Sequence, residues 1–324
     1  MPVTRRSFVA GGAAWTAAFG LGFASQAEAA TVSFGGRAFA STWRIAGGAT
    51  LDERLLRPPV EAIIQRVDEQ MSPWRNDSDI SRFNRNATTA WQPLPSDVCH
   101  VVAESLAVAE ITSGAFDPTV GPAVARFGFG PINGGSGSYK AIIVENGAVR
   151  KAHHDLTLDL CGIAKGHALD EIADLLHRAG VTSALIELGG EVSAIGEHPM
   201  GRPWQVAIEQ PGTPQVTAHR IIAPGHLALA SSGHSANGYR GRVALSHLID
   251  PSDLRPTDNS LAAVSVLAPT AIRADALATA LMVLGPQRGI QCASELAVSA
   301  LFLTRTDNGL DETMTGSFSD HVVA

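Results

Sequence analysis

Apolar side chains recur along this chain with two spacings, which predict different elements. In residues 59–71, Val60, Ile63, Ile64 and Val67 share one face of a 3.6-residue period, as in an amphipathic helix. Similar spacing predicts helices over residues 97–112, 166–179 and 289–296, and residues 270–284 are apolar on nearly every side. Short runs rich in Val, Ile and Leu predict strands over residues 32–45, 141–150, 157–160, 184–188, 192–195, 204–209, 219–222, 227–231, 242–249, 262–267 and 299–304. Residues 72–86 are polar and predict a loop.

The order of these elements indicates the fold class. Helices and strands mix without strict strand–helix–strand alternation, which favours an α+β fold over a doubly wound sheet. No internal repeat and no clear linker interrupts the pattern. We therefore expect one compact domain with mixed sheets and flanking helices over residues 30–324.

Composition narrows the classes of protein further. The chain has 324 residues, of which 45% are hydrophobic and 17% charged, so it has ample material for a core. Its formal net charge is −7, whereas nucleic-acid binders usually carry a basic surface, so we expect no nucleic-acid partner. Cys99, Cys161 and Cys292 fit no metal-cluster spacing, and their odd number argues against a disulfide framework, although one disulfide remains open.

Residues 1–29 have the pattern of an export signal. Arg5 and Arg6 precede an apolar stretch over residues 10–24, and Ala27-Glu28-Ala29 offers small residues to a signal peptidase. The paired arginines predict export through the Tat route, with an ordinary Sec signal as the alternative. No cysteine lies near the cleavage point, so we expect a periplasmic protein without a lipid anchor.

Two segments offer groups for phosphate chemistry. Residues 159–166, DLCGIAKG, join a predicted strand to a helix, and Lys165 puts a cation where helix N–H groups also favour anions. A solvated lysine in an ordinary strand–helix turn is the alternative. His247 lies at a strand end before Asp250-Pro251 and is a candidate general base, although a lone histidine is more often structural.

The apolar run RADALATALMVLG, residues 273–285, contains a carboxylate and a hydroxyl. Asp275 and Thr279 are four residues apart and so share one helix face. One interpretation is a helix start, in which Thr270 or Asp275 caps and Thr279 bonds back to the carbonyl of Asp275. A buried carboxylate needs a cationic partner, and the alternative is a hard cation such as Mg²⁺.

Taken together, motifs spread from Ala38 to about Gly285 resemble the ApbE family of FAD:protein FMN transferases. Each motif is weak alone, and the resemblance rests on finding all of them in the family's order. They are MSPW (71–74), SDISRFN (78–84), GAFDPTVGP (114–122), FGF (127–129), DLCGIAKG (159–166), LGGE (188–191), SG (232–233), SHLIDP (246–251) and ADALATA (274–280).

The resemblance implies a specific reaction. Such enzymes split FAD at its pyrophosphate, release AMP and link FMN by a phosphoester to a Thr or Ser of another protein, with Mg²⁺ required. It implies metal binding by Asp275, Thr279 and the backbone carbonyl of Gly162, and His247 as the catalytic base. It also implies FAD contacts at Phe39, Trp74, Ala115, Phe116, Asp117, Asp159, Lys165, Ile249 and Ala278.

Three departures from the family pattern qualify these expectations. Phe39-Ala40-Ser41 replaces the usual Met-Gly-Thr, Cys161 replaces a Ser, and residues 234–239 lack the usual acidic and aromatic pattern. The acceptor implied is a periplasmic or membrane redox protein, for instance of a nitrous-oxide-reduction system. An FAD pyrophosphatase that hands FMN to water, and a flavin-binding protein without catalysis, are the competing hypotheses.

Overall fold

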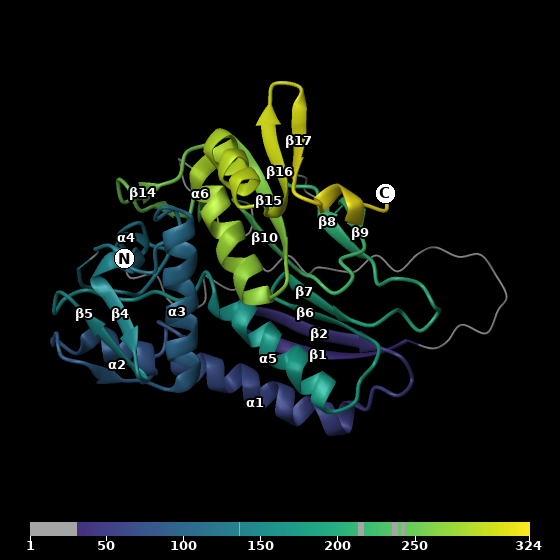
Figure 1. The fold of residues 1–324 in the computed structure, drawn as a ribbon, viewed down its shortest axis with the longest axis horizontal. Coiled ribbons are helices and arrows are strands. Elements are labelled where there is room, and N and C mark those ends of the chain that lie inside the picture. The colour runs from purple at the N-terminus through teal and green to yellow at the C-terminus, as the bar shows by residue number, and fades with distance from the viewer. Residues whose placement is uncertain (1–30, 136, 213–216, 235–238, 241–243) are drawn as a thin grey trace.

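Eight strands form one antiparallel sheet through the middle of the protein (Figure 1). The computed structural model describes residues 31–324 except 136, 213–216, 235–238 and 241–243. Each pair of neighbouring strands runs antiparallel. In sheet order the strands are β1 (Val32–Ala38), β2 (Ser41–Gly47), β6 (Ala184–Leu188), β7 (Glu191–Ile195), β10 (Ala228–Gly233), β15 (Leu261–Ala268), β16 (Ser299–Thr306) and β17 (Gly309–Thr315).

Apolar side chains are buried on both faces of the sheet's second half. On β10, Ala228 and Ala230 join the main core, whereas Leu229 between them joins a second cluster. Alternation of this kind follows from the two-residue period of a strand. The second cluster lies under the hairpin of β8 (Val206–Glu209) and β9 (Ala218–Ile222) and under Phe318 of the 3₁₀-helix η2 (Phe318–His321).

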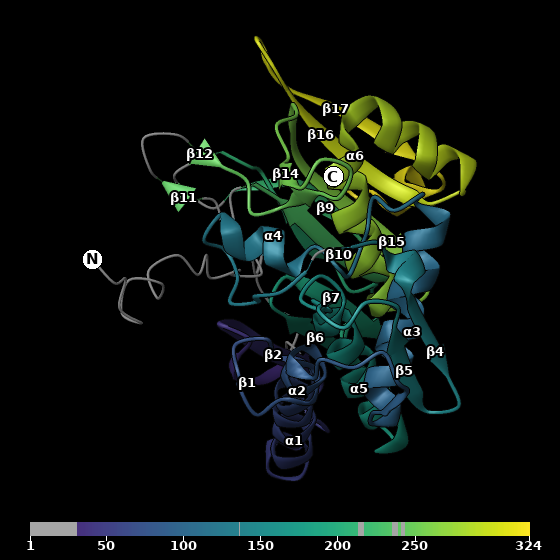
Figure 2. The same ribbon diagram turned by 90° about the vertical axis from the view of Figure 1, so that its left-hand side faces the viewer.

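Four long helices lie on the other side of the sheet. They are α1 (Glu53–Met71), α3 (Ser96–Ile111), α5 (Ala164–Arg178) and α6 (Ala271–Glu295). α6 packs on β10 and β15, α5 packs on β7, and the two helices contact each other, whereas α3 packs on α6 rather than on the sheet itself. Figure 2 shows α3, α5 and α6 gathered beside the sheet, with α1 packed against α5 at one end. The mixture of antiparallel sheet and helices confirms the α+β prediction.

α6 combines the two helices that the sequence predicts over residues 270–284 and 289–296. It is kinked at Gly285, whose φ of 75° is accessible to glycine, and Pro286 follows. Neither Thr270 nor Asp275 caps it with a side chain. Instead, Asp170 of α5 accepts hydrogen bonds from the Ala271 and Ile272 N–H groups at 2.7 and 2.9 Å. A tertiary contact therefore supplies the cap.

Several smaller elements differ from the prediction. Residues 72–86 contain the helix α2 (Asp79–Arg85), whose N-cap is Ser78. Residues 141–150 form a hairpin, β4 (Ile142–Glu145) and β5 (Ala148–Lys151), because Asn146 and Gly147 turn with positive φ. Residues 157–160 are not a strand, and β17 follows the strand expected to be last.

The remaining elements are short. They are β3 (Gln92–Pro93), α4 (Gly121–Arg126), η1 (Tyr139–Ala141), β11 (Tyr239–Arg240), β12 (Ala244–Leu245), β13 (Ile249–Asp250) and β14 (Arg255–Pro256). The strand predicted over residues 242–249 lies partly outside the described residues, and the described part divides between β12 and β13.

The expected export signal, residues 1–29, lies outside the described residues. Across the described part of the chain, no helix has the length and apolarity needed to cross a membrane. Cys99, Cys161 and Cys292 are all free thiols, which answers the open question of a disulfide.

Candidate active site

The amino end of α5 and the first turns of α6 bring three charged side chains together. The Lys165 ammonium donates to Glu191 Oε1, and its Nζ lies 3.9 Å from Asp275 Oδ1. Asp275 Oδ2 accepts a hydrogen bond from the Gly166 N–H at 3.1 Å. The cationic partner that a buried Asp275 requires is therefore present, from an element 110 residues earlier in the chain than Asp275.

Close approach of the two helices makes this cluster possible. A Cβ on Gly166 would lie 2.3 Å from the Ala271 carbonyl oxygen, so no larger residue fits between the helix backbones. Glu191 reaches the cluster from the first residue of β7, directly after the Gly189-Gly190 turn. Helix contact and hairpin geometry together place Lys165 between two carboxylates.

The charges in this cluster perturb one another. Asp275 and Glu191 are 4% and 2% exposed, and burial raises the pKa of both carboxyls, that of Glu191 to about 7. The two carboxylates raise the pKa of Lys165 against the opposing effect of burial. With one cation for two carboxylates, the cluster carries an excess of negative charge that a bound cation would offset.

Thr279 lies one turn beyond Asp275 and faces the loop before α5. Its Oγ1 is 3.4 Å from Ser232 Oγ on β10, and a Cβ on Gly162 would lie 3.5 Å from the same Oγ1. The partner that the structure gives Thr279 is thus Ser232 rather than the Asp275 carbonyl. Gly162 therefore lies beside the Thr279 hydroxyl, on the face of α6 that also carries Asp275.

These donors suit Mg²⁺. Within the described residues, no group of three or more His, Cys, Asp or Glu side chains could hold a metal. Asp275, Thr279 and the Gly162 carbonyl offer hard oxygen donors, and Mg²⁺ commonly binds one or two carboxylates plus substrate phosphates and water. Asp275 Oδ1, at 3.9 Å from Lys165 Nζ, is beyond hydrogen-bonding distance of that ammonium.

His247 lies between β12 and β13 and is neutral at physiological pH. Burial, with smaller contributions from the positive charges of His234 and Lys165, lowers the pKa of His247 to about 4. Its Nδ1 is buried without a hydrogen-bond partner in the described part of the chain, and its ring meets Phe129 edge-on at 6.3 Å. A neutral imidazole is chemically able to accept a proton.

Ser246 holds the segment that carries His247. Its hydroxyl lies 2.9 Å from His234 Nδ1 and 3.2 Å from Thr257 Oγ1, and it accepts the Leu248 N–H at 3.1 Å. This network fixes the residues on both sides of His247, so the imidazole is positioned by its neighbours in sequence.

The loops carrying Asp117 and Asp159 meet beside the cluster. Asp117 is 8% exposed and its carboxylate organises its own loop, accepting hydrogen bonds from Thr119 and from the Tyr139 N–H. The Asp159 N–H donates to the Pro118 carbonyl, and Asp159 Oδ1 accepts from the Cys161 N–H. Both carboxylates thus shape backbone next to Gly162.

The other residues expected to contact FAD differ in burial and in their distance from the cluster. Phe116 is buried, and its ring edge would lie 3.3 Å from a Cβ on Gly162, whereas Ala115 is buried beside it in sequence. Phe39 makes the β1–β2 turn with a φ of 49°, and Trp74 is 58% exposed after α1. Ile249 is buried on β13, and Ala278 on α6 is fully buried.

The sequence predicts no role for two residues that contact this cluster, Glu191 and Ser232. Glu191 follows the Gly189-Gly190 pair and precedes an apolar run, a position at which a carboxylate could equally be an exposed turn residue. Ser232 stands in a pair of small residues at the end of β10 and gives no distinctive pattern, so its contact with Thr279 required the fold.

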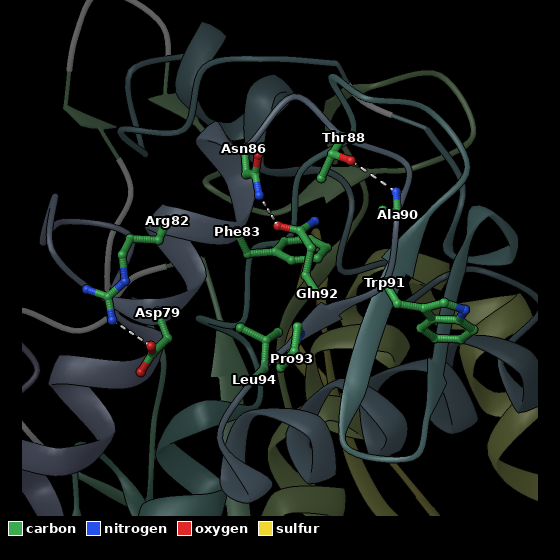
Figure 3. Close-up of a pocket in the computed structure, with 10 residues that line it drawn as sticks. All are labelled: Asp79, Arg82, Phe83, Asn86, Thr88, Ala90, Trp91, Gln92, Pro93 and Leu94. Atoms are coloured by element: carbon green, nitrogen blue, oxygen red, sulfur yellow. Dashed lines mark hydrogen bonds and ion pairs between the residues drawn. The ribbon is translucent and has the colours of Figure 1, made fainter.

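A surface cavity of about 460 Å³ lies away from this cluster, between α2 and β3 (Figure 3). It is lined by Asp79, Arg82, Phe83, Asn86, Thr88, Ala90, Trp91, Gln92, Pro93 and Leu94. None of the expected site residues is among them, so its size does not mark it as the reaction site.

Comparison with known proteins agrees with this geometry. The model of the ApbE family matches residues 39–302. An FAD:protein FMN transferase of Vibrio cholerae is 34% identical over 282 residues, covering 82% of this chain and 84% of the relative. The solved structure of flavin transferase ApbE from Vibrio cholerae has a TM-score of 0.82 at 32% identity and covers 90% of this chain and 99% of that one. The apo flavinyl transferase ApbE of Pseudomonas stutzeri gives a TM-score of 0.82 at 32% identity, covering 91% and 98%. This chain belongs to the ApbE family.

Proposed function

We propose that this enzyme splits FAD at its pyrophosphate with Mg²⁺, releases AMP and joins FMN by a phosphoester to a Thr or Ser of an acceptor protein. Its family and its relatives support FMN transfer from FAD to protein. The metal, the acceptor residue and the compartment are the parts that we add. The observation that carries the proposal is the approach of Lys165 to Asp275, one turn before Thr279 on α6. The neutral His247, whose pKa is lowered in part by the charge of Lys165, adds a candidate base.

Each group has a task that phosphoryl transfer requires. Such transfer needs neutralisation of phosphate charge and an oriented nucleophile. Asp275, Thr279 and the Gly162 carbonyl would hold the ion, and Mg²⁺ supplies Lewis-acid stabilisation of pyrophosphate charge when bound. Lys165 adds a fixed positive charge beside it, near the amino end of α5.

His247 handles the proton of the acceptor. Its imidazole takes the proton from the Thr or Ser hydroxyl as that oxygen attacks the phosphorus on the FMN side of the pyrophosphate. The P–O bond to AMP breaks, AMP leaves with the bridging oxygen, and the proton passes from the imidazole to solvent or to AMP. A pKa of about 4 keeps His247 ready to accept a proton at neutral pH in the free enzyme.

The flavin nucleotide would contact the loops around the cluster. We assign Phe39, Trp74, Ala115, Phe116, Asp117, Asp159, Lys165, Ile249 and Ala278 to FAD binding, as the family resemblance implies. Phe116 and Lys165 have the best-supported positions, since each lies beside a residue of the proposed cation site. The structural hydrogen bonds of Asp117 favour an indirect role, in which it shapes the loop that meets FAD.

We also propose that the enzyme works outside the cytoplasm. The paired Arg5-Arg6, the apolar residues 10–24 and Ala27-Glu28-Ala29 support Tat export and cleavage near residue 29, leaving residues 30–324 as the mature domain. The acceptor would then be a periplasmic or membrane redox protein, as in a nitrous-oxide-reduction system.

Product analysis tests the proposed reaction. The purified enzyme is incubated with FAD, Mg²⁺ and a candidate periplasmic acceptor domain, and AMP, free FMN and flavin fluorescence on a denaturing gel are measured. We expect AMP together with a fluorescent acceptor band, and loss of both when EDTA is added. AMP with only free FMN would indicate an FAD pyrophosphatase, and intact FAD would indicate a flavin-binding protein without catalysis.

A further inference from the structure

Glu191 is a buried carboxylate for which the proposed reaction has no task. It is 2% exposed, and its Oε2 has no hydrogen-bond partner among the residues that the structure describes. Its Oε1 accepts from the Lys165 ammonium. Burying a carboxylate costs free energy unless the carboxylate is paired with a cation. The pairing with Lys165 therefore offsets the cost of burying Glu191.

Lys165 stands between two carboxylates at unequal distances. It is in direct hydrogen-bond contact with Glu191, whereas 3.9 Å separates its Nζ from Asp275 Oδ1. A shift of about 1 Å would bring the ammonium into hydrogen-bonding distance of Asp275. The lysine side chain has four rotatable bonds and would make that shift if Glu191 did not retain it.

We propose that Glu191 is a positioning residue, which holds the Lys165 ammonium off Asp275 and so keeps the Asp275 carboxylate available to a divalent cation. This inference rests on the proposed function, because it takes Asp275 as a ligand of the cation.

Electrostatics explains why a Lys165–Asp275 pair would exclude a cation. An ammonium paired directly with Asp275 would occupy the oxygen that a cation needs, and would repel the cation at close range. Retained by Glu191, the same ammonium stays near the site for the phosphates of the substrate. Glu191 thus lets one site hold a lysine and a metal ion side by side.

A thermodynamic cycle on metal binding tests the proposal without relying on activity. Mn²⁺ alone is titrated into the purified protein, and free Mn²⁺ is counted by electron paramagnetic resonance. The variants are Glu191→Gln, Lys165→Met and the double variant. Glu187→Gln is the matched control, since Glu187 stands on the same β6–β7 hairpin and the charged group that acts on it is Arg44 rather than Lys165.

Positioning predicts a strong coupling between the two substitutions. Glu191→Gln should weaken Mn²⁺ binding about tenfold when Lys165 is present and less than about threefold in the Lys165→Met background. Glu187→Gln should leave Mn²⁺ binding within about twofold of wild type. Should Glu191→Gln fail to fold by circular dichroism, Glu191→Met takes its place in the same cycle.

Three outcomes would overturn the proposal. Equal weakening in both backgrounds would show that Glu191 acts as a ligand or by charge alone. Unchanged binding in Glu191→Gln would show that Lys165 is not a competitor. Absence of saturable Mn²⁺ binding to the wild-type protein would remove the proposed cation site itself, and is distinguishable because it appears before any variant is made.

Discussion

Replacing Gly166 by alanine tests the helix contact on which the whole site depends. The added Cβ would lie 2.3 Å from the Ala271 carbonyl oxygen, 2.6 Å from its carbonyl carbon and 2.7 Å from Ile272 Cα. All three atoms are backbone, so no side chain can rotate away. Because ordinary contacts begin near 3.4 Å, α5 and α6 would have to separate by about 1 Å.

The cost of this separation falls on both stability and chemistry. Overpacking of a rigid core costs about 3 kcal/mol at the upper end of its usual range, which is about 6 °C in melting temperature for a domain of this size. The hydrogen bond from the Gly166 N–H to Asp275 Oδ2, now 3.1 Å, would lengthen with the shift. We therefore expect FMN transfer to fall in Gly166→Ala even at temperatures where the variant is folded.

Urea denaturation followed by circular dichroism, with transfer measured on the same samples, provides the assay. Gly48→Ala is the matched control, because the added Cβ would meet only Pro199, at ordinary distances of 3.4 Å to Cγ and 3.9 Å to Cβ. That control should be neutral or slightly more stable than wild type. If Gly166→Ala were as stable and as active as Gly48→Ala, the tight α5–α6 contact would be wrong.

Three further predictions concern His247 and the cap of α6. His247→Ala should slow transfer by about 10²–10⁴, with FAD affinity by fluorescence quenching nearly unchanged; transfer at the wild-type rate would remove His247 as the base. Because the base works unprotonated and its pKa is about 4, the loss of kcat/KM for FAD caused by protonation of His247 should be centred near pH 4, below any loss near pH 7 from protonation of Glu191; a loss centred near 6.5 in Glu191→Gln, which lacks that carboxyl, would contradict the burial argument. Asp170→Ala should lower the free energy of unfolding by about 1–2 kcal/mol, measured in urea, since it removes the acceptor of two N–H groups at the start of α6; an unchanged midpoint would show that this cap does not stabilise the helix.

Long periodic elements could be predicted from the sequence, because a single amphipathic face is a local signal. The helices α1, α3 and α5 and the strands β6 and β7 lie where their apolar spacing predicts them. The polar pattern does not predict α2, because Ser78, its N-cap, is equally typical of a polar loop. The apolar spacing of residues 141–150 predicts one strand, whereas Asn146-Gly147 is a turn signal and the structure has the β4–β5 hairpin there.

The site, too, has features that the sequence predicts and features that depend on tertiary packing. The spacing of Asp275 and Thr279 predicts a shared helix face, and the cost of burying a carboxylate predicts a cationic partner for Asp275. The sequence could not identify Lys165 as this partner, because Lys165 is distant from Asp275 in the chain and approaches it only through the α5–α6 contact. The Glu191 and Asp170 contacts depend on the same packing, so no local pattern could assign them.

Intact-mass measurement of an acceptor protein tests the central claim most directly. Wild-type enzyme, FAD and Mg²⁺ should raise the acceptor mass by one FMN less one water, with AMP released in equal amount. Asp275→Asn, which keeps the side chain's size and an acceptor for the Gly166 N–H, should leave the acceptor unmodified at every Mg²⁺ concentration. Mg²⁺-dependent modification by Asp275→Asn at the wild-type rate would contradict the account.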